Sequence, residues 1–158
     1  MARATHPASS DNGPLLHLVK LCVGAEEVED LALWQTARSL ERKRQGRDPR
    51  PRHTTRMFPR RAEELLAGGS LYWVFRGVIR ARQVIEAIEP VECEDGITRY
   101  DLVLSHRIVL TRPQPRRPFQ GWRYLPAKDA PTDIPGDFDD QPDLPPGLRE
   151  AVSEYGVL

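Results

Sequence analysis

Three consecutive segments with the composition of β-strands limit the fold of this chain more than any other feature. Residues 70–75 are rich in aromatic and β-branched side chains, residues 78–91 continue as a long strand-like run, and residues 98–111 place large side chains at every second position. Gly77 and an Asp-Gly pair that ends at Gly96 separate these segments at turn positions. Successive strands joined by short turns predict a mostly antiparallel sheet.

The segments that precede this sheet predict two more strands and two helices. Residues 15–23 are almost continuously apolar, which is typical of a strand near the middle of a sheet. Residues 25–44 have helical spacing, and residues 52–58 and 59–67 predict a short strand and a short helix. The expected apolar side of the long helix consists of Val28, Leu31, Trp34, Ala37 and Leu40. The predicted fold class is α+β, with two helices flanking a small, curved, mostly antiparallel sheet or partly closed pseudobarrel.

The length and the composition of the chain predict one domain between two tails. A chain of 158 residues and 18.0 kDa has material for one core. We expect residues 1–14 to form a disordered N-terminal tail and residues 15–125 to form the domain. Residues 126–158 are rich in proline and aspartate, so we expect a partly disordered acidic tail that ends in a short helix over residues 148–158.

The formal net charge of zero is the sum of a positive domain and a negative tail. Residues 15–128 hold 21 basic and 14 acidic side chains, a balance of +7, whereas residues 129–158 carry −7. Ten of the basic side chains lie between residues 38 and 61. Such a cluster suits a polyanionic partner such as RNA, and a solvated surface is the alternative interpretation. The neutral total therefore does not exclude a nucleic-acid-binding protein.

Several classes of protein are disfavoured by the sequence. Cys22 and Cys93 stand 71 positions apart, which argues against a disulfide scaffold or a zinc module and indicates reduced thiols. His17, His53 and His106 have no short ligand spacing, so we expect core histidines rather than a metal site. No stretch approaches the roughly 18 apolar residues of a membrane span. We expect a cytoplasmic protein with no membrane partner, metal or cofactor.

Aromatic rings interleaved with arginines are the best candidates for contact with a nucleic acid, because rings stack on bases and guanidinium groups neutralise phosphates. Trp73 is expected in the core, whereas Trp122 beside Gly121 suits a pocket or the core equally well. The donors of residues 52–56 suit a phosphate contact or a solvated edge strand, and Ser70 suits a turn better than a pocket. The predicted nucleic-acid-binding residues are Arg52, Thr54, Thr55, Arg56, Ser70, Tyr72, Arg76, Gln120, Trp122, Arg123 and Tyr124.

Two resemblances add to these observations. The segments HLVKLCVG (17–24), HTTRM (53–57), GGSLYWV (68–74) and RPFQGWRYL (117–125) resemble an uncharacterised alphaproteobacterial family of small proteins, a domain of unknown function. A short helix, a Gly-Gly stop and the strands LYWVFRG (71–77) and IRARQVIEAI (79–88) together resemble the PUA-like superfamily, which includes the ASCH and EVE modules. The second resemblance implies a pseudobarrel that binds RNA or a modified base in a pocket between its first helical region and the sheet.

The leading hypothesis is a nucleic-acid-binding module without catalysis, which holds RNA or a modified nucleotide in an Arg/aromatic pocket. The resemblance to ASCH modules implies one alternative, a small amidohydrolase acting on a modified nucleoside. Its hydroxyl would come from Thr54 or Thr55 and its carboxylate from Glu86 or Glu89. Arg52 fills the position of the lysine in such enzymes, and an arginine is a poor proton acceptor. The other alternative is a protein-interaction module, whose acidic tail docks on the basic face of this chain or of a partner.

Overall fold

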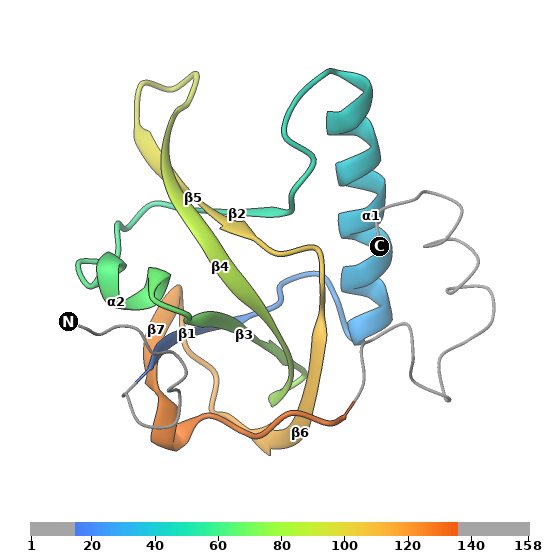
Figure 1. Cartoon of the computed structure of the whole chain (residues 1–158), viewed down its shortest axis with the longest axis vertical. Helices are drawn as coiled ribbons and strands as arrows, with labels where there is room; N and C mark the ends of the chain where they lie inside the picture. Colours follow the sequence, from blue (N-terminus) through green and yellow to red (C-terminus); the bar gives the residue numbers. More distant parts are fainter. Residues whose placement is uncertain (1–14, 136–158) are drawn as a thin grey trace.

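The computed structural model describes residues 15–135, which form seven β-strands and two α-helices (Figure 1). The helices are α1 (Val28–Arg44) and α2 (Ala62–Leu66). The strands are β1 (Leu16–Leu21), β2 (Arg52–Thr55), β3 (Ser70–Phe75), β4 (Val78–Glu92), β5 (Thr98–Leu104), β6 (Val109–Pro115) and β7 (Trp122–Pro126). This architecture confirms the predicted α+β class. Residues 1–14 and 136–158, where tails are expected, lie outside the described part of the chain.

The strands form one curved sheet in the order β2-β5-β4-β3-β1-β7, and β6 pairs with β4 outside this path. Every strand pair is antiparallel except β1–β3, which confirms a mostly antiparallel sheet. The pairings of β4 with β3, β5 and β6 all contain register shifts, which let this long strand bend. Among the described residues, strand pairing does not close the sheet, and β2 and β7 are its two ends.

The predicted single strand over residues 98–111 is wrong, because the structure divides this segment into β5 and β6. The two strands pair with different parts of β4: β5 with Ile85–Glu92 and β6 with Val78–Arg82. Residues 105–108 make the crossing between these two positions. His106 therefore lies half-buried in a connection rather than on a strand face. Side-chain alternation continues through this crossing, so the sequence pattern does not reveal it.

Helix α1 is present, and Val28 and Leu31 of its predicted apolar side are buried, but the prediction is wrong for Trp34 and Ala37, which are exposed. Its buried residues are Val28, Leu31, Ala32, Gln35, Thr36 and Ser39. Leu33 and Trp34 are 43% and 49% exposed. A buried amide pair accounts for this orientation of α1 about its axis. The Gln35 and Gln83 side chains exchange hydrogen bonds of 3.0 and 2.9 Å, which turns the Gln35 side of the helix toward the sheet. The Gln83 side chain also accepts from Trp73 Nε1 and donates to the Ser105 carbonyl, so its amide is well satisfied.

The sheet has an apolar core on each face. Leu71, Trp73 and Phe75 of β3 point into the first core, which also contains Leu31 of α1 and Leu65 of α2. The alternate β3 residues Tyr72 and Val74 point into a smaller second core with Val19, Ile79 and Leu125. This alternation is the period of two that a strand imposes. It decides which candidate residues share a face of the sheet and can meet.

Residues 130–135 run along β6 and cover part of the second face, and we call them the strap. The amide of Arg112 donates to the Thr132 carbonyl and the amide of Ile134 to the Leu110 carbonyl, each at 2.8 Å. Asp133 also forms an isolated bridge with Thr111. This part of the predicted tail is thus held against the sheet by backbone hydrogen bonds.

Candidate nucleic-acid interface

The two ends of the sheet approach each other through the loop of residues 56–61, which follows β2. Trp122 Nε1 of β7 donates to the Met57 carbonyl at 3.4 Å, and the amide of Arg61 donates to the Tyr124 hydroxyl at 3.1 Å. The register of β7 against β1 sets Trp122 opposite Lys20, so both side chains lie on the face of the first core. The opening between β2 and β7 is therefore spanned by side-chain contacts rather than by paired strands.

Beside this opening lie four aromatic residues and one methionine, which are exposed or partly exposed and which we call the aromatic surface: Met57, Phe58, Tyr100, Trp122 and Tyr124. Met57 and Phe58 are 66% and 45% exposed. The Phe58 ring meets the Tyr100 ring edge-on at 5.1 Å, and Trp122 meets Tyr124 in the same manner at 5.0 Å. Single exposed apolar residues are common, whereas a group of neighbouring ones is a candidate interaction surface.

Three arginines flank the aromatic surface. Arg56, Arg60 and Arg61 are all exposed, and the Arg61 guanidinium lies 5.5 Å from the centroid of the Tyr124 ring. Arg61 also pairs with Glu64 at 2.7 Å in an exposed contact, which contributes little to stability. The combination of rings and guanidinium groups can stack on unpaired bases and contact the phosphates between them.

Lys20 and His53 stand behind this surface on the face of the first core. Lys20 is half-buried, and no hydrogen bond or ion pair within residues 15–135 holds its ammonium group. Burial lowers the pKa of Lys20. His53 meets the Trp73 ring edge-on at 5.6 Å, and its buried Nε2 atom has no hydrogen-bond partner among these residues. Burial and the nearby Lys20 charge lower the pKa of His53 to about 4.

The structure brings some of the predicted binding residues to the opening. Arg56, Trp122 and Tyr124 lie at the aromatic surface. The Thr55 hydroxyl accepts from the Met57 amide at 3.4 Å and so shapes the adjoining loop. Thr54 lies on β2, where its hydroxyl donates to Asp101 at 2.6 Å.

Arg52 has a structural environment that differs from that of an open phosphate contact. Its side chain is only 14% exposed, and its guanidinium forms ion pairs with Asp48, Glu89 and Asp101. Hydrogen bonds to Glu89 and Asp101 raise its pKa against the effect of burial. Arg50 is tied in the same way to Asp48 and Glu86. Part of the basic segment 38–61 is thus neutralised internally.

Other predicted residues lie on the opposite face of the sheet or beyond its end. Tyr72 is 4% exposed and packs edge-on against His17, and burial raises its pKa to about 12. The Arg123 guanidinium lies over the Phe119 ring at 5.3 Å and donates to the Gln120 carbonyl. Arg76 is exposed in the β3–β4 turn, where it pairs with Glu27. The predicted residues therefore do not converge on one pocket.

The prediction that Ser70 is a turn residue is wrong. Ser70 is fully buried as the first residue of β3, and its hydroxyl accepts from Arg82 Nη1 at 2.8 Å. Its amide donates to His17 Nδ1 at 3.0 Å. Burial is possible because each of these polar groups has a partner. The two glycines before Ser70 signal the end of α2 rather than a turn around the serine.

The residues implied by the hydrolase alternative are partly connected: Arg52 pairs with both Glu89 and Asp101, and Asp101 accepts from Thr54, whereas Glu86 is bonded to none of these four residues. The Thr54 hydroxyl bonds to Asp101, and the Glu86 carboxylate pairs with Arg50 at 3.1 Å. No hydrogen bond within the described chain joins Thr54 to Glu86.

Residues 15–135 contain no group of three potential metal ligands, and none of their helices is long and apolar enough to cross a membrane.

The sequence analysis did not single out Lys20, Met57 or Phe58, whereas Arg61 belongs to the predicted basic segment 38–61. Lys20 had a usable signal, because a lysine inside the apolar run of residues 15–23 is unusual for a buried strand. Met57 and Phe58 had none, since the loop that carries them meets β7 only through the three-dimensional fold.

Comparison with known proteins gives a family and no function. A family model described as "Protein of unknown function (DUF1489)" matches residues 18–158, a span that includes the whole aromatic surface. No curated protein and no solved structure matches the chain.

Proposed function

We propose that this chain, which belongs to the DUF1489 family of proteins of unknown function, is a nucleic-acid-binding module. Its ligand is RNA in single-stranded form, or a modified nucleotide within such a strand, and it catalyses no reaction. RNA as the ligand would put the protein in the cytoplasm. The observation that carries the proposal is the contact between Trp122 and Met57, which joins two aromatic segments from opposite ends of the sheet.

A single strand suits this surface better than a duplex does. Bases must be unstacked before they can lie on protein rings, and such stacking contributes about 1–3 kcal/mol per base. The exposed side chains of Met57 and Phe58 and the partly exposed rings of Trp122 and Tyr124 offer several adjacent stacking positions. Arg56, Arg60 and Arg61 border these positions and would neutralise phosphates.

We also propose that the fold is a PUA-like pseudobarrel and that its relatives are small alphaproteobacterial proteins. The order of elements supports the first proposal: α2 is followed by Gly68-Gly69, then by β3 and the long bent β4. The approach of β2 to β7 gives the sheet the outline of an incompletely closed barrel. The amino-acid sequences of residues 17–24 and 117–125 support the proposal about alphaproteobacterial relatives.

Binding of a fluorescently labelled, unstructured single-stranded RNA to the full chain tests the proposed function. Fluorescence anisotropy at several salt concentrations should show affinity that falls as salt rises. With the three arginines contacting phosphates, the slope of log K against log salt should be roughly −2, because each neutralised phosphate on a single strand contributes about −0.7. Arg56→Ala should reduce the magnitude of that slope by about 0.7.

Two further variants distinguish the aromatic surface from general attraction to a basic protein. Phe58→Ala should weaken binding roughly fivefold or more, since it removes one stacking ring. Arg112→Ala is the matched control, because Arg112 is exposed on β6, which pairs with neither β2 nor β7. Equal losses for Arg56→Ala and Arg112→Ala, or affinity that is independent of salt, would contradict the proposal.

A further inference from the structure

The outer side of α1 carries apolar side chains that no described helix or strand covers. Leu33, Trp34 and Ala37 are all exposed, and Figure 1 shows none of the described elements beyond this side of the helix. The buried side of α1, by contrast, includes three polar residues: Gln35, Thr36 and Ser39. A surface helix usually turns its apolar side inward. The outer side of α1 is therefore a candidate for contact with another segment.

The same helix is positively charged toward its C-terminal end. Residues 38–47 hold five basic side chains and one acidic side chain, a balance of +4. The acidic one, Glu41, pairs with Arg44 at 3.7 Å. Within residues 15–135, no carboxylate pairs with the other exposed basic side chains of this segment: Arg38, Lys43 and Arg47. A segment that combines acidic and apolar side chains would suit this surface.

Residues 136–158 of the chain have this composition. They contain six acidic residues and one arginine, a balance of −5. A helix over residues 148–158, as expected from the sequence, would place Leu148, Val152 and Tyr155 on one side. The family model also includes this segment, because its match runs from residue 18 to residue 158. The acidic segment is thus a feature of the family.

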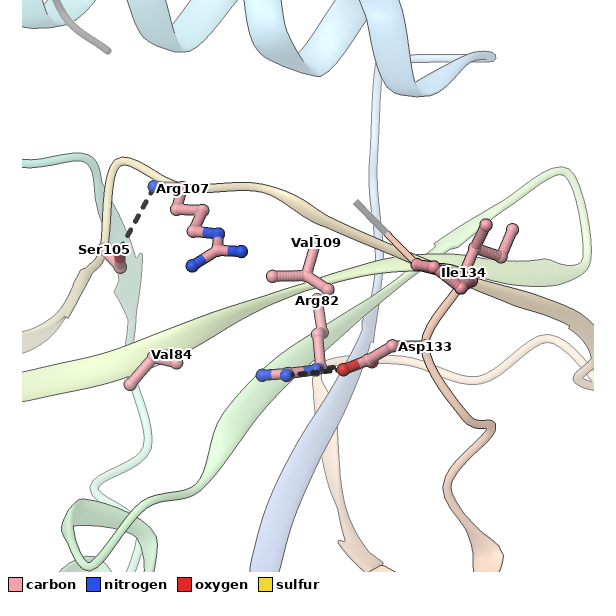
Figure 2. A pocket seen from close by; sticks show the side chains of 8 residues that line it. Arg82, Val84, Ser105, Arg107, Val109, Asp133 and Ile134 are labelled. Carbon is pink, nitrogen blue, oxygen red and sulfur yellow. Dashed lines mark hydrogen bonds and ion pairs between the residues drawn. The ribbon is translucent and has the colours of Figure 1, made fainter. Parts of the chain in front are cut away.

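The strap fixes the place where the acidic segment begins. Asp133 accepts from Arg82 Nε and Nη2 at 2.9 and 2.8 Å, beside a pocket between β4, β6 and the strap (Figure 2). Pro135, the last described residue, lines this pocket together with Ser105. The acidic segment therefore leaves the fold beside the crossing between β5 and β6.

This starting point is connected to α1 by hydrogen bonds. The Ser105 carbonyl accepts from Gln83, whose side chain exchanges hydrogen bonds with Gln35 of α1. Helix α1 has 17 residues and is about 25 Å long, at about 1.5 Å per residue. The 23 residues from 136 to 158 can span roughly 75 Å when extended, at about 3.3 Å per residue, so they can reach any part of the helix.

We propose that residues 136–158 fold back and dock on the outer side of α1. Their apolar side chains pack against Leu33 and Trp34, and their carboxylates lie near Arg38 and the basic C-terminal end of the helix. Opposite charges, a matching apolar side and a short path from the strap favour the acidic segment of the same chain over any other occupant. The inference does not depend on RNA binding, because the aromatic surface lies elsewhere on the molecule.

A spin label in the acidic segment of the full-length chain tests this proposal. A nitroxide can be attached at Ser153→Cys in a chain that also carries Cys93→Ser, since the other thiol, Cys22, is buried. A nitroxide weakens the ¹⁵N–¹H signals of groups close to it. Comparison with the same label after chemical reduction gives the loss of intensity at each signal.

The Trp34 indole and the amides of Leu33 and Ala37 should lose intensity, and the loss should lessen as salt rises, because salt screens the attraction between exposed charges. The Trp122 indole, at the aromatic surface, should keep its intensity. A mixture of ¹⁵N-labelled chain without nitroxide and unlabelled chain with nitroxide reports contacts between copies. This mixture should show no loss at Trp34.

Arg38→Glu should restore most of the intensity at the Leu33 amide, because it places a negative charge beside the acidic segment. Arg60→Glu is the matched control and should leave the loss unchanged, since Arg60 is exposed in the loop between β2 and α2. The proposal is overturned by full intensity at Trp34, by equal losses at Trp34 and Trp122, or by equal effects of the two variants. A loss of the same size in the mixture would assign the surface to a second copy of the chain and would also overturn it.

Discussion

The pKa values of His17 and His53, which lie on opposite faces of the sheet, are set by the surroundings of each ring. His17 is 6% exposed, and its Nδ1 accepts the Ser70 amide, which requires a neutral ring. Burial and the charge of Arg82 lower the pKa of His17 to about 4, although Asp133 acts in the opposite direction. Burial and Lys20 lower the pKa of His53 to the same value. Both rings are thus neutral at pH 7.

These two histidines predict a loss of stability in mild acid. Below a pH of about 6.5 the unfolded chain binds protons at both imidazoles, whereas the folded chain does not until about pH 4. The free energy of unfolding should therefore fall between these pH values, by on the order of 3 kcal/mol for each histidine at full effect. Urea denaturation at a series of pH values measures this change.

His53→Phe tests the contribution of His53, because it keeps an aromatic ring against Trp73 and removes the titrating group. The variant should lose part of the pH dependence while remaining folded at pH 7, because His17 and His106, whose pKa values burial also lowers, keep their contributions. An unchanged pH dependence would show that His53 is not the source of the effect.

At the scale of whole elements, the sequence predicts which helices and strands exist better than which side of each faces the core. The position of α1 follows from its spacing, but its orientation depends on Gln35 and Gln83, which are 48 residues apart in the chain. Likewise, the division between β5 and β6 depends on β4, which pairs with both. Such long-range pairs leave no local pattern.

The sequence likewise predicts the residue types of the candidate site better than which of them lie together. Alternation along β3 already separates Tyr72 from Trp73, and along β7 it separates Arg123 from Trp122. The strand period alone therefore argues against convergence of all these residues on one pocket. The register of β1 against both β3 and β7 is needed to know which residues of these two strands share a face of the sheet.

The orientation of α1 predicts a contrast between two large apolar residues. Leu31→Ala should destabilise the protein by about 2–5 kcal/mol, because it opens a cavity in the first core. Trp34→Gln should change the free energy of unfolding by less than about 1 kcal/mol, since the Trp34 ring is half exposed and contacts the Arg38 guanidinium at 4.4 Å. Chemical denaturation of the two variants checks this. Similar losses would mean that α1 is rotated from the orientation described above.

For the molecule as a whole, the two faces of the sheet carry different chemistry. The first-core face ends in the aromatic surface, where contacts between the loop of residues 56–61 and β7 bridge the open side of the sheet. The second face carries the strap, whose Asp133 forms an ion pair with Arg82 of β4. A neutral total charge is compatible with polyanion binding, because residues 15–128 carry +7.

The three tryptophans allow one direct test of where RNA binds. Trp122 lies at the aromatic surface, Trp73 is buried in the first core, and Trp34 is exposed on α1. Each indole N–H gives its own signal in a ¹⁵N–¹H spectrum of the full chain, so a titration with single-stranded RNA reports on all three places at once. We predict a saturable shift of the Trp122 signal, with Trp34 unaffected and Trp73 changed little. A shift of Trp34 alone, or no shift of Trp122 at saturating RNA, would contradict the proposed interface.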